Sequence, residues 1–330
     1  MGYALEPPTQ PNHFDLLNLP IVSIIGDIRD RDLLFKTFRE FKPEIVFHLA
    51  AQSLVRYSYI DPVSTFETNV IGTVNVLEAA RQTPSVKAVI IITSDKCYEN
   101  KEWVWGYREI DLMGGYDPYS ASKGCSEIIT AAYRRSFFNP ENYGKDHQCL
   151  VATCRAGNVI GGGDWAEDRL VPDIIKATVK REKVLIRSPY SIRPWQHVLE
   201  PLSGYVLLGQ RLLEGDKEFA DAWNFGPYEK DNVQVITLVE RIKSFWNKVD
   251  YVIAEDSKNF HEAGLLKLEC SKARFLLGWE PVWDFEKSVF VTTRWYKSFY
   301  EKNMVLTEQD LTEYIDHAKT KKVNWVKNRD

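Results

Sequence analysis

Short apolar runs alternate with longer segments of helical periodicity through the first half of the chain. The run 89–92 is continuously apolar and β-branched, which predicts a strand buried on both faces of a sheet. Similar runs predict strands at 22–25, 45–49, 89–94 and 150–155, and helical spacing predicts helices at about 30–41, 61–81 and 119–138. Pro62 lies in the first turn of the second helix, where proline is favoured. Strands that alternate with helices at this interval predict βαβ units and a doubly wound parallel sheet.

The pattern becomes less regular after residue 155. Strands are predicted at 184–186 and 222–225, among helices at about 171–181, 199–213, 236–246 and 285–300. The charged, amphipathic tail from residue 307 predicts a solvated helix. We therefore predict an α/β fold with a sheet domain over residues 1–155 and a smaller, mixed C-terminal lobe over 156–330, which also returns elements to the main sheet.

Composition argues against several classes of partner and site. The 330 residues carry 42 Lys and Arg against 46 Asp and Glu, and this net charge of −4 favours neither nucleic acid nor an anionic membrane. No apolar run approaches the length of a membrane span. The cysteines lack CxxC pairing, which favours reduced thiols of a cytoplasmic protein over disulfides or a metal site. They are Cys97, Cys125, Cys149, Cys154 and Cys270.

The main chemical signal is a polar triplet at the end of the most apolar strand. Ser94, Asp95 and Lys96 follow the run 89–92, at the edge where open α/β sheets bind ligands. Tyr119 and Lys123 lie one turn apart near the start of the next helix, so both side chains can point to one spot. A lone Tyr-x-x-x-Lys spacing is common by chance, but this context predicts a hydride-transfer site.

Four longer segments narrow this prediction. Residues 93–98, 114–124, 155–165 and 193–198 read TSDKCY, GGYDPYSASKG, RAGNVIGGGDW and RPWQHV. Together they resemble the extended short-chain dehydrogenase/reductase superfamily, and within it the sugar-nucleotide dehydratases that act on CDP-glucose. The resemblance implies a Rossmann-like fold whose first domain binds NAD and whose second lobe binds substrate. It also implies deoxysugar synthesis for lipopolysaccharide O-antigen, and a homodimer through helices near 61–81 and 120–138.

The resemblance assigns catalytic roles to the five polar residues. Tyr119 would be the base for the sugar 4-hydroxyl, and Lys123 would lower the pKa of the phenol and bind the nicotinamide ribose. Ser94 would align the substrate oxygen. Asp95 would be the acid and Lys96 the C5 base of the water elimination that yields CDP-4-keto-6-deoxyglucose. Because a dry pocket disfavours both charges, we expect a proton to pass from Lys96 to Asp95 to give a neutral pair.

The same resemblance implies binding residues for cofactor and substrate. Besides Tyr119 and Lys123, those for NAD are Asp27, Ile28, Leu49, Ala50, Ala51 and Asn69. Those for the nucleotide sugar are Asn158, Arg169, Leu170, Arg193 and Asn224. Arg193 is the first choice for the diphosphate, since a guanidinium can make paired, charge-assisted hydrogen bonds. Alternatives are a helix N-cap for Asp27 and a turn former for Asn224. His48 is expected to be a packed strand residue.

One family feature is missing from the sequence. Members of this superfamily begin with a strand, a Gly-x-x-Gly-x-x-Gly turn and a helix whose N-terminus holds the cofactor pyrophosphate. Residues 2–5 resemble the second strand, so we expect a fragment, a mis-started gene model or a naturally shortened relative. The first strand is central in the order 3-2-1-4-5-6. We therefore expect the second and third strands to be separated from the rest, with weak NAD binding and poor folding.

Four functions remain open from the sequence. The first is dehydration of CDP-glucose, and its nearest rivals are dehydration of another sugar nucleotide or 4-epimerisation. The adjacent Asp95 and Lys96 favour dehydration over epimerisation, because elimination needs an acid and a base. The last is a non-catalytic, truncated protein that binds sugar nucleotides. The choice of cytosine as the base rests on the resemblance alone.

Overall fold

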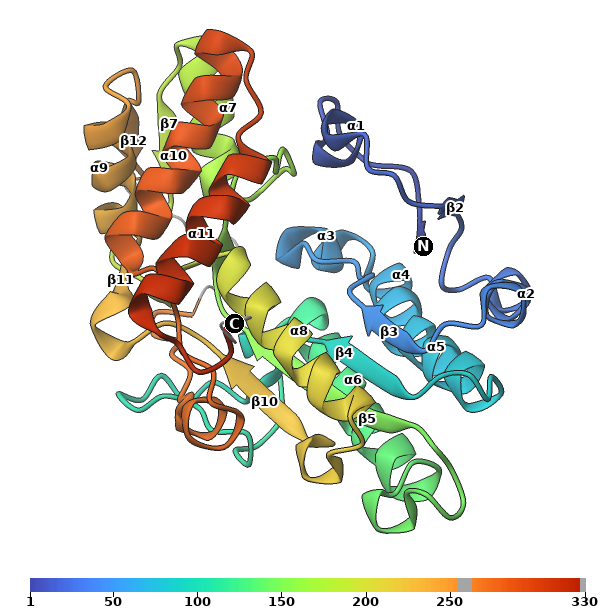
Figure 1. The fold of residues 1–330 in the computed structure, drawn as a ribbon. Coiled ribbons are helices and arrows are strands. Elements are labelled where there is room, and N and C mark those ends of the chain that lie inside the picture. The colour runs from blue at the N-terminus through green and yellow to red at the C-terminus, as the bar shows by residue number, and fades with distance from the viewer. Residues whose placement is uncertain (255–262, 327–330) are drawn as a thin grey trace.

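The structure is a computed structural model that describes residues 1–254 and 263–326. Its central element is a parallel sheet in the order β10-β5-β4-β3 (Figure 1). These strands are β3 (Ile45–His48), β4 (Ala88–Ile92), β5 (Leu150–Ala156) and β10 (Ala222–Phe225). Every residue of β5 is buried, because the sheet is covered on both faces.

Alternating residues of β4 enter two different cores. Val89 and Ile91 pack with α2, α5 and α6 on one face, whereas Ala88 and Ile90 pack with α8 on the other. The four helices are α2 (Arg31–Phe41), α5 (Gly72–Arg81), α6 (Pro118–Ser136) and α8 (Leu199–Leu213). Helices on both faces of a parallel sheet confirm the predicted α/β, Rossmann-like fold.

The N-terminal strands form a separate sheet. Strand β1 (Gly2–Ala4) pairs in parallel with β2 (Ser23–Ile25), and α1 (His13–Leu17) lies between them in the sequence. Within residues 1–254 and 263–326, neither strand pairs with β3, and Figure 1 shows the pair set apart from the main sheet. The expected separation of the second and third strands of the fold is therefore found.

The predicted helix 61–81 is built from three pieces. It consists of α4 (Pro62–Phe66), a π-helical turn η1 (Glu67–Ile71) and α5, and α3 (Val55–Ile60) precedes it. Asp61 caps α4 by accepting a hydrogen bond from Ser64 N at 2.9 Å, which fixes the predicted start of the helix. Wide turns of this kind are frequent at functional sites, and this one carries Asn69.

The C-terminal lobe contains helices and short strand pairs. Its core includes Ile174, Leu238, Ile242 and Trp295. Its pairs are β6–β9 and β7–β12, which are parallel, and β8–β11, which is antiparallel. Its strands are β6 (Val159–Ile160), β7 (Val184–Ile186), β8 (Ile192–Pro194), β9 (Gln196–His197), β11 (Asn232–Gln234) and β12 (Tyr251–Ile253). Its helices are α7 (Leu170–Lys180), α9 (Val235–Phe245), α10 (Phe285–Lys302) and α11 (Thr307–Lys321).

Helix α11 corrects the prediction of a solvated tail. Its residues Asp310, Tyr314 and Ala318 are buried at a spacing of four, so one face of the helix packs inward. Tyr314 and Ala318 share a core with Val282 and Val291. The helix is solvated only on its other faces, and the short apolar stripe among many charges explains why the sequence pattern concealed the packing.

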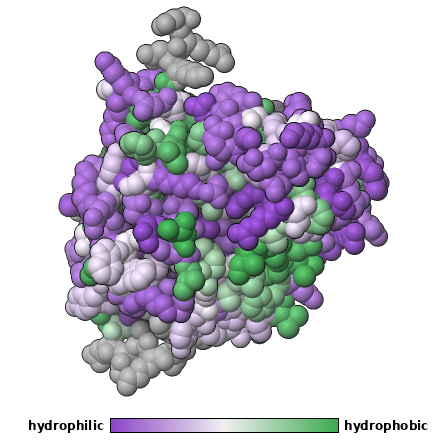
Figure 2. Space-filling view, turned by 90° about the horizontal axis from the view of Figure 1, so that it is seen from below, coloured by the Kyte–Doolittle hydropathy of each residue, from purple (hydrophilic) through white to green (hydrophobic). Residues whose placement is uncertain are grey.

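Five further short helical turns connect the longer elements among the described residues. The turns are η2 (Asp95–Cys97), η3 (Pro140–Asn142), η4 (Lys217–Phe219), η5 (Glu229–Asp231) and η6 (Ala273–Leu277). Hydrophilic residues cover most of the face in Figure 2, and hydrophobic residues gather mainly in one area of it. Among the described residues, no helix has both the length and the apolar character that crossing a membrane requires. All five cysteines are free thiols.

Candidate active site

The segment after β4 presents the predicted polar triplet at the carboxyl end of the sheet. Ser94 adopts extended backbone and caps the 3-10 turn η2, since its Oγ accepts a hydrogen bond from Lys96 N at 3.2 Å. Ser94 and Asp95 are buried, and Lys96 is partly exposed. The strand therefore delivers three functional side chains within a single turn, as predicted.

Helix α6 brings the tyrosine and the lysine to the same place. Asp117 caps this helix by accepting from Ser120 N at 2.9 Å, and the helix then buries Tyr119 and Lys123 one turn apart. The Tyr119 phenol is hydrogen-bonded to Ser94. Lys123 Nζ donates to the carbonyl of Ile92, at the end of β4, over 3.3 Å. The structure thus brings Ser94, Tyr119 and Lys123 together.

The electrostatics of Tyr119 differ from the sequence-based expectation. Burial raises the pKa of Tyr119 to about 12, although the hydrogen bond with Ser94 opposes this and the Asp95 carboxylate adds to it. We expected Lys123 to lower this pKa. The pKa of Tyr119 is raised instead, because the phenol is buried and its loss of solvent outweighs the other effects on this pKa.

Lys123 is itself affected by burial. The same loss of solvent lowers the pKa of Lys123 to about 8, and the Glu127 carboxylate, one turn further along α6, opposes the change. Only one hydrogen bond from its ammonium group lies within the described residues. An ammonium has three donors, so the group retains capacity to bind a ligand.

Asp95 has the properties of a buried acid. Its Oδ1 accepts from Ser94 Oγ at 3.1 Å, while the buried Oδ2 has no partner among residues 1–254 and 263–326. A side chain at Gly157 would begin 3.2 Å from Oδ2 and 2.4 Å from Pro194, so the close packing beside this carboxyl requires glycine. Burial raises the pKa of Asp95, against the opposing charge of Lys96. The proposed neutral form of this carboxyl is therefore favoured.

Two arginines from the C-terminal lobe approach these residues. Arg193 is buried in β8, where its Nη1 donates to Ile192 O at 2.9 Å and its charge acts on Asp95. Arg169 precedes α7 and lies near enough to Tyr119 to lower its pKa slightly. Arg169 donates to Asp164 Oδ2 at 2.9 Å and to Ser53 Oγ at 2.6 Å. Arg169 therefore links the lobe to the segment that follows β3.

The other predicted substrate residues lie around these arginines or behind them. Asn158 follows β5, and its carbonyl accepts from Gln196 N at 3.1 Å. Leu170 begins α7 and packs against the core of the C-terminal lobe. Asn158 is partly exposed, so it can contact a ligand.

Asn224 has a different place from the one predicted. Its side chain is fully buried, accepts from Tyr98 OH at 2.7 Å and donates to the carbonyls of Tyr107 and Glu269 at 2.8 and 3.0 Å. The alternative of a turn former is also wrong, since Asn224 lies within β10. With its amide fully used, Asn224 connects loops behind the site, and the structure gives no support for a contact to phosphate.

The residues predicted to bind the cofactor lie in two places, after β3 and in the N-terminal pair of strands. Leu49, Ala50 and Ala51 follow β3, and the small side chains at 50 and 51 leave space beside the strand end. Asn69 holds the next residue of this segment, because its Oδ1 accepts from Gln52 N at 2.8 Å and its Nδ2 donates to Gln52 O at 2.9 Å. Asn69 also donates to Ser122 of α6 over 2.8 Å, so it joins the segment after β3 to this helix.

Asp27 and Ile28 belong to the N-terminal pair of strands. Asp27 forms an ion pair with Arg29 at 2.6 Å. The alternative role as an N-cap is wrong, because Asp30 caps α2 by accepting from Leu33 N at 3.0 Å. Ile28 is buried, and a side chain at Gly72 would begin 2.4 Å from its Cδ1. Ile28 can therefore offer a ligand its backbone rather than its side chain.

His48 is a packed residue, as expected. It is buried in β3, and its Nε2 lies 3.1 Å from Thr73 Oγ1. Burial, together with the charge of Lys123, lowers the pKa of His48 to about 3, so the ring is neutral. In the part of the chain that the structure describes, no cluster of three or more His, Cys, Asp or Glu side chains is arranged to hold a metal ion.

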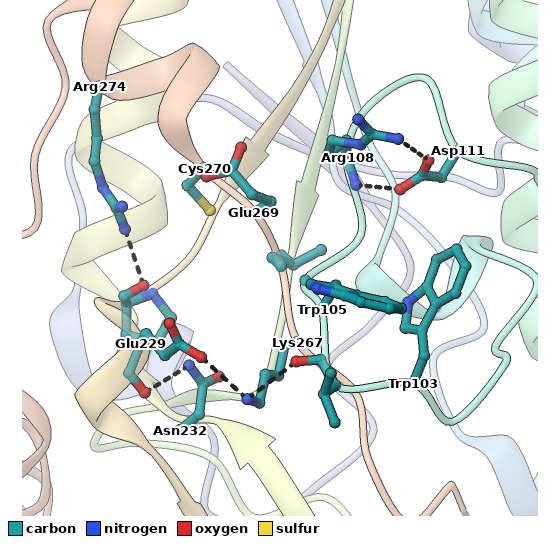
Figure 3. A pocket seen from close by; sticks show the side chains of 14 residues that line it. Trp103, Trp105, Arg108, Asp111, Glu229, Asn232, Lys267, Glu269, Cys270 and Arg274 are labelled. Atoms are coloured by element: carbon teal, nitrogen blue, oxygen red, sulfur yellow. Dashed lines mark hydrogen bonds and ion pairs between the residues drawn. The ribbon is translucent and has the colours of Figure 1, made fainter.

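The residues around Lys123 are chemically compatible with a nicotinamide ribose. They combine the free donors of Lys123, the small residues Ala50 and Ala51, and a buried phenol. A separate pocket of about 540 Å³ contains none of the predicted site residues. Figure 3 shows Arg108 paired with Asp111 and Lys267 paired with Glu229, and two tryptophans lie beside the pocket.

Sequence reasoning missed the residues that support the site. Glu127 lies four residues after Lys123 on α6, and Arg155 begins one of the four quoted segments, yet the sequence analysis gave neither residue a role. The spacing of four from Lys123 was an available signal, since it places Glu127 on the same helix face. Ser53 and Asp164, which hold Arg169, had no such signal.

The chain is similar in sequence to known sugar-nucleotide dehydratases. A CDP-glucose 4,6-dehydratase of Salmonella typhimurium is 50% identical over 318 residues, which cover 95% of this chain and 88% of the relative. A dTDP-glucose 4,6-dehydratase of the same organism is 26% identical, over 82% of this chain and 77% of that protein.

Solved structures show the same fold. The UDP-glucose 4-epimerase of Thermotoga maritima, determined with UDP-glucose, has a TM-score of 0.75 and 22% identity, covering 90% of this chain and 91% of that one. The dTDP-glucose 4,6-dehydratase of Bacillus anthracis in complex with NAD has a TM-score of 0.66 and 21% identity, over 85% and 81% of the two chains. The sequence model of the GDP-mannose 4,6 dehydratase family matches residues 12–291, and the chain therefore belongs to this family.

Proposed function

We propose that the protein catalyses the NAD-dependent dehydration of CDP-glucose to CDP-4-keto-6-deoxyglucose. The observation that carries this proposal is that Ser94, Asp95 and Tyr119 lie close together. In addition, Asp95 Oδ2 has no hydrogen-bond partner among the described residues. The 50% identity to a CDP-glucose 4,6-dehydratase supports the choice of reaction and nucleotide. The lobe over 156–330 would bind the nucleotide sugar, and the domain over 1–155 would bind the cofactor.

The first half of the reaction needs a base at the sugar 4-hydroxyl. Tyr119 as phenolate would take the hydroxyl proton, and Ser94, already hydrogen-bonded to the phenol, would align the sugar oxygen. Bound NAD would supply the chemistry of accepting hydride from C4 and returning it to C6. Lys123 would hold the nicotinamide ribose through its remaining donors, and Asn69 would keep the strand-end segment in place.

The second half is an elimination across C5 and C6. With C4 oxidised, the proton on C5 is acidic, and neutral Lys96 would remove it. Protonated Asp95 would give its proton to the departing C6 hydroxyl, which leaves as water. Burial of Asp95 favours its protonated form before this step.

The arginines would bind the diphosphate. Arg193 stands beside Asp95, and Arg169 stands beside Tyr119, so a diphosphate bound by both would place its sugar over the catalytic residues. Asn158 and Leu170 would complete the contacts to the nucleotide.

The test is turnover with three substrates. Wild-type protein with NAD is incubated with CDP-glucose, dTDP-glucose and UDP-glucose, and mass spectrometry follows the loss of one water. We expect loss of water from CDP-glucose first. Faster loss of water from another nucleotide sugar would show that the protein is a different dehydratase. An epimerised product without loss of water would show that it is a 4-epimerase. Binding without any reaction would show that it is not catalytic.

The variant Asp95→Asn separates the two halves. We expect C4 oxidation to continue and reduced cofactor to accumulate, seen by its absorbance, while dehydration stops. Asp146→Asn, at an exposed position, is the matched control and should dehydrate as the wild type does. Full dehydration by Asp95→Asn would remove Asp95 from the mechanism.

We also propose a cytoplasmic homodimer. Val63 on α4, Ile71 in η1 and Ile128 on α6 are large apolar residues exposed on neighbouring helices, which supports association through a four-helix bundle. Free cysteines support a reducing compartment. The reaction product would feed deoxysugar synthesis for lipopolysaccharide O-antigen. Sedimentation should give a dimer for the wild type and a monomer for Ile128→Glu.

A further inference from the structure

A buried ion pair lies directly behind the candidate active site. Glu127 Oε2 and Arg155 Nη2 are 2.8 Å apart, and both side chains are only 4% exposed. Burying two charges is costly, and apolar residues of similar size often serve stability equally well. The pair therefore calls for a role other than stability.

Glu127 holds the strand end that carries the catalytic triplet. One carboxylate oxygen accepts a hydrogen bond from Thr93 Oγ1, and the other accepts from Thr153 Oγ1 at 2.7 Å. Thr93 immediately precedes Ser94, whereas Thr153 lies inside β5, away from the triplet. Glu127 also follows Lys123 by one turn on α6, so one carboxylate links the helix to the strand end.

Arg155 holds the other end of the same segment. Its Nη1 donates to Tyr98 OH at 2.6 Å, and its guanidinium lies over the Tyr98 ring, 4.9 Å from the centroid. Tyr98 OH in turn donates to Asn224 of β10 at 2.7 Å. Residues 94–97 are thus anchored at Thr93 on one side and at Tyr98 on the other, by the two partners of one ion pair.

We propose that Glu127 and Arg155 are positioning residues, which hold Ser94, Asp95 and Lys96 at a fixed place relative to Tyr119 and Lys123. The inference rests on the proposed function. A displacement of about 1 Å in such a site can lower turnover about 100-fold. The pair would keep the strand-end segment from shifting along α6 when substrate binds.

The electrostatics of Lys123 support this inference. The negative charge of Glu127 opposes the lowering of the Lys123 pKa by burial. Removing that charge should lower the pKa of Lys123 further, because a cation loses its nearby anion. Glu127 would therefore set both the position and the charge of the groups around Tyr119.

Two threonine variants form a matched test. Thr93→Val and Thr153→Val each remove one hydrogen bond from the same carboxylate, at two buried positions. We expect Thr93→Val to lower kcat for CDP-glucose at least about 10-fold with KM little changed, and Thr153→Val to stay within about 3-fold. Melting temperatures of both variants check the fold. Equal effects of the two substitutions, or none from Thr93→Val, would overturn the proposal.

Crystal structures of the same two variants test the positioning of Ser94 without a measurement of enzyme activity. We expect Thr93→Val to move Ser94 Oγ away from the Tyr119 phenol and Thr153→Val to leave it in place. A wild type that dehydrates none of the substrates contradicts the proposed function, while the structures still test the positioning. Unmoved Ser94 in Thr93→Val would contradict the positioning itself.

A third variant tests the charge. In Glu127→Gln, the pH titration of the Lys123 ammonium, followed by NMR of the lysine side chains, should shift to lower pH. The exposed Lys36 serves as the internal reference. Unchanged titration of Lys123 would exclude the electrostatic contribution of Glu127.

Discussion

At the residue scale, the candidate site depends on side chains that burial has moved away from their usual chemistry. Tyr119 is a harder group to ionise than a free phenol, and Asp95 is a weaker acid than a free carboxyl, because both lie in a dry environment. Burial thus favours protonated Asp95, which the proposed elimination needs. It disfavours the Tyr119 phenolate, which the proposed oxidation needs. Substrate and cofactor would have to supply the missing stabilisation of the phenolate.

Tyr119→Phe tests the proposed base directly. Phenylalanine fills the same space, so we expect a melting temperature close to that of the wild type. Turnover of CDP-glucose should fall by about 10² to 10⁴, the usual contribution of a positioned base. Tyr251→Phe, on β12, is the control and should leave turnover unchanged. A Tyr119→Phe variant with normal kcat would exclude this tyrosine as the base.

Glu200 gives a prediction for the pH dependence of stability. Its carboxylate accepts from Val282 N, Trp283 N and Tyr314 OH at 2.7–2.8 Å, yet burial raises its pKa to about 7. The unfolded chain loses this proton near its ordinary pKa of about 4, before the folded protein does. The stabilising contribution is therefore complete below that pH and declines by about 3 kcal/mol as the pH rises to about 7.

Chemical denaturation at several pH values measures this decline. The unfolding free energy of the wild type minus that of Glu200→Gln should fall between about pH 4 and pH 7 and then level off. A difference that is constant, or that rises with pH, would contradict the assignment to Glu200.

At the element scale, α11 shows how a charged helix can be integral to a lobe. Its buried residues lie at a spacing of four and meet the segment around Val282. Tyr314 OH also reaches Glu200, at the start of α8, over 2.8 Å. The helix thus connects two parts of the lobe that are far apart in the sequence.

A pair of glutamate substitutions distinguishes the packed face from the solvated one. Ala318→Glu places a charge in a buried position and should lower the unfolding free energy by about 2 kcal/mol or more. Thr312→Glu, on an exposed part of α11, should change it by less than about 1 kcal/mol. Similar effects of both, measured by urea denaturation, would show that α11 does not pack as described.

The elements that the sequence predicted well are those with a long periodic signal. Helix α8 has the predicted bounds because its apolar residues repeat over 15 positions, and the short, mainly apolar strands β7 and β10 have the predicted bounds as well. The strands β6 and β9 have only two residues each, too few for periodicity to appear. The π turn at Glu67–Ile71 leaves no trace in the pattern, because its residues are ordinary helix formers.

The sequence predicted those site residues whose spacing and position are typical of a single function. Tyr119, Lys123 and Ser94 could be found because their spacing and their strand end are both specific. Asn224 was misplaced, because an asparagine at a strand end can equally bind a ligand or tie loops together. Glu127 was overlooked because its function depends on Thr93 and Arg155, partners that only the folded chain brings together.

At the scale of the whole molecule, the main parallel sheet and the N-terminal parallel pair β1–β2 do not join within residues 1–254 and 263–326. The main sheet buries every residue of β5 and every residue of β4 except Ile92, whereas β1 and β2 are three residues each and lack buried residues. Elements with little buried apolar area open more readily than the core. The N-terminal pair should therefore be the least stable part of the fold.

Hydrogen exchange followed by mass spectrometry measures this difference. Amides of β1 and β2 should exchange at least about 10-fold faster than those of β4 and β5 under native conditions. Peptides covering α8 serve as an additional stable reference. Equal protection of the two sheets would mean that the N-terminal pair is held by contacts other than those described.

The unpaired edges of β1 and β3 also bear on how copies of the protein behave together. Amide and carbonyl groups along such an edge can bind any extended chain that reaches them. In concentrated solution, the nearest extended chain belongs to a neighbouring molecule. Solubility would then be limited by a few residues of main chain rather than by surface charge, and crowding would favour aggregation even at a net charge of −4.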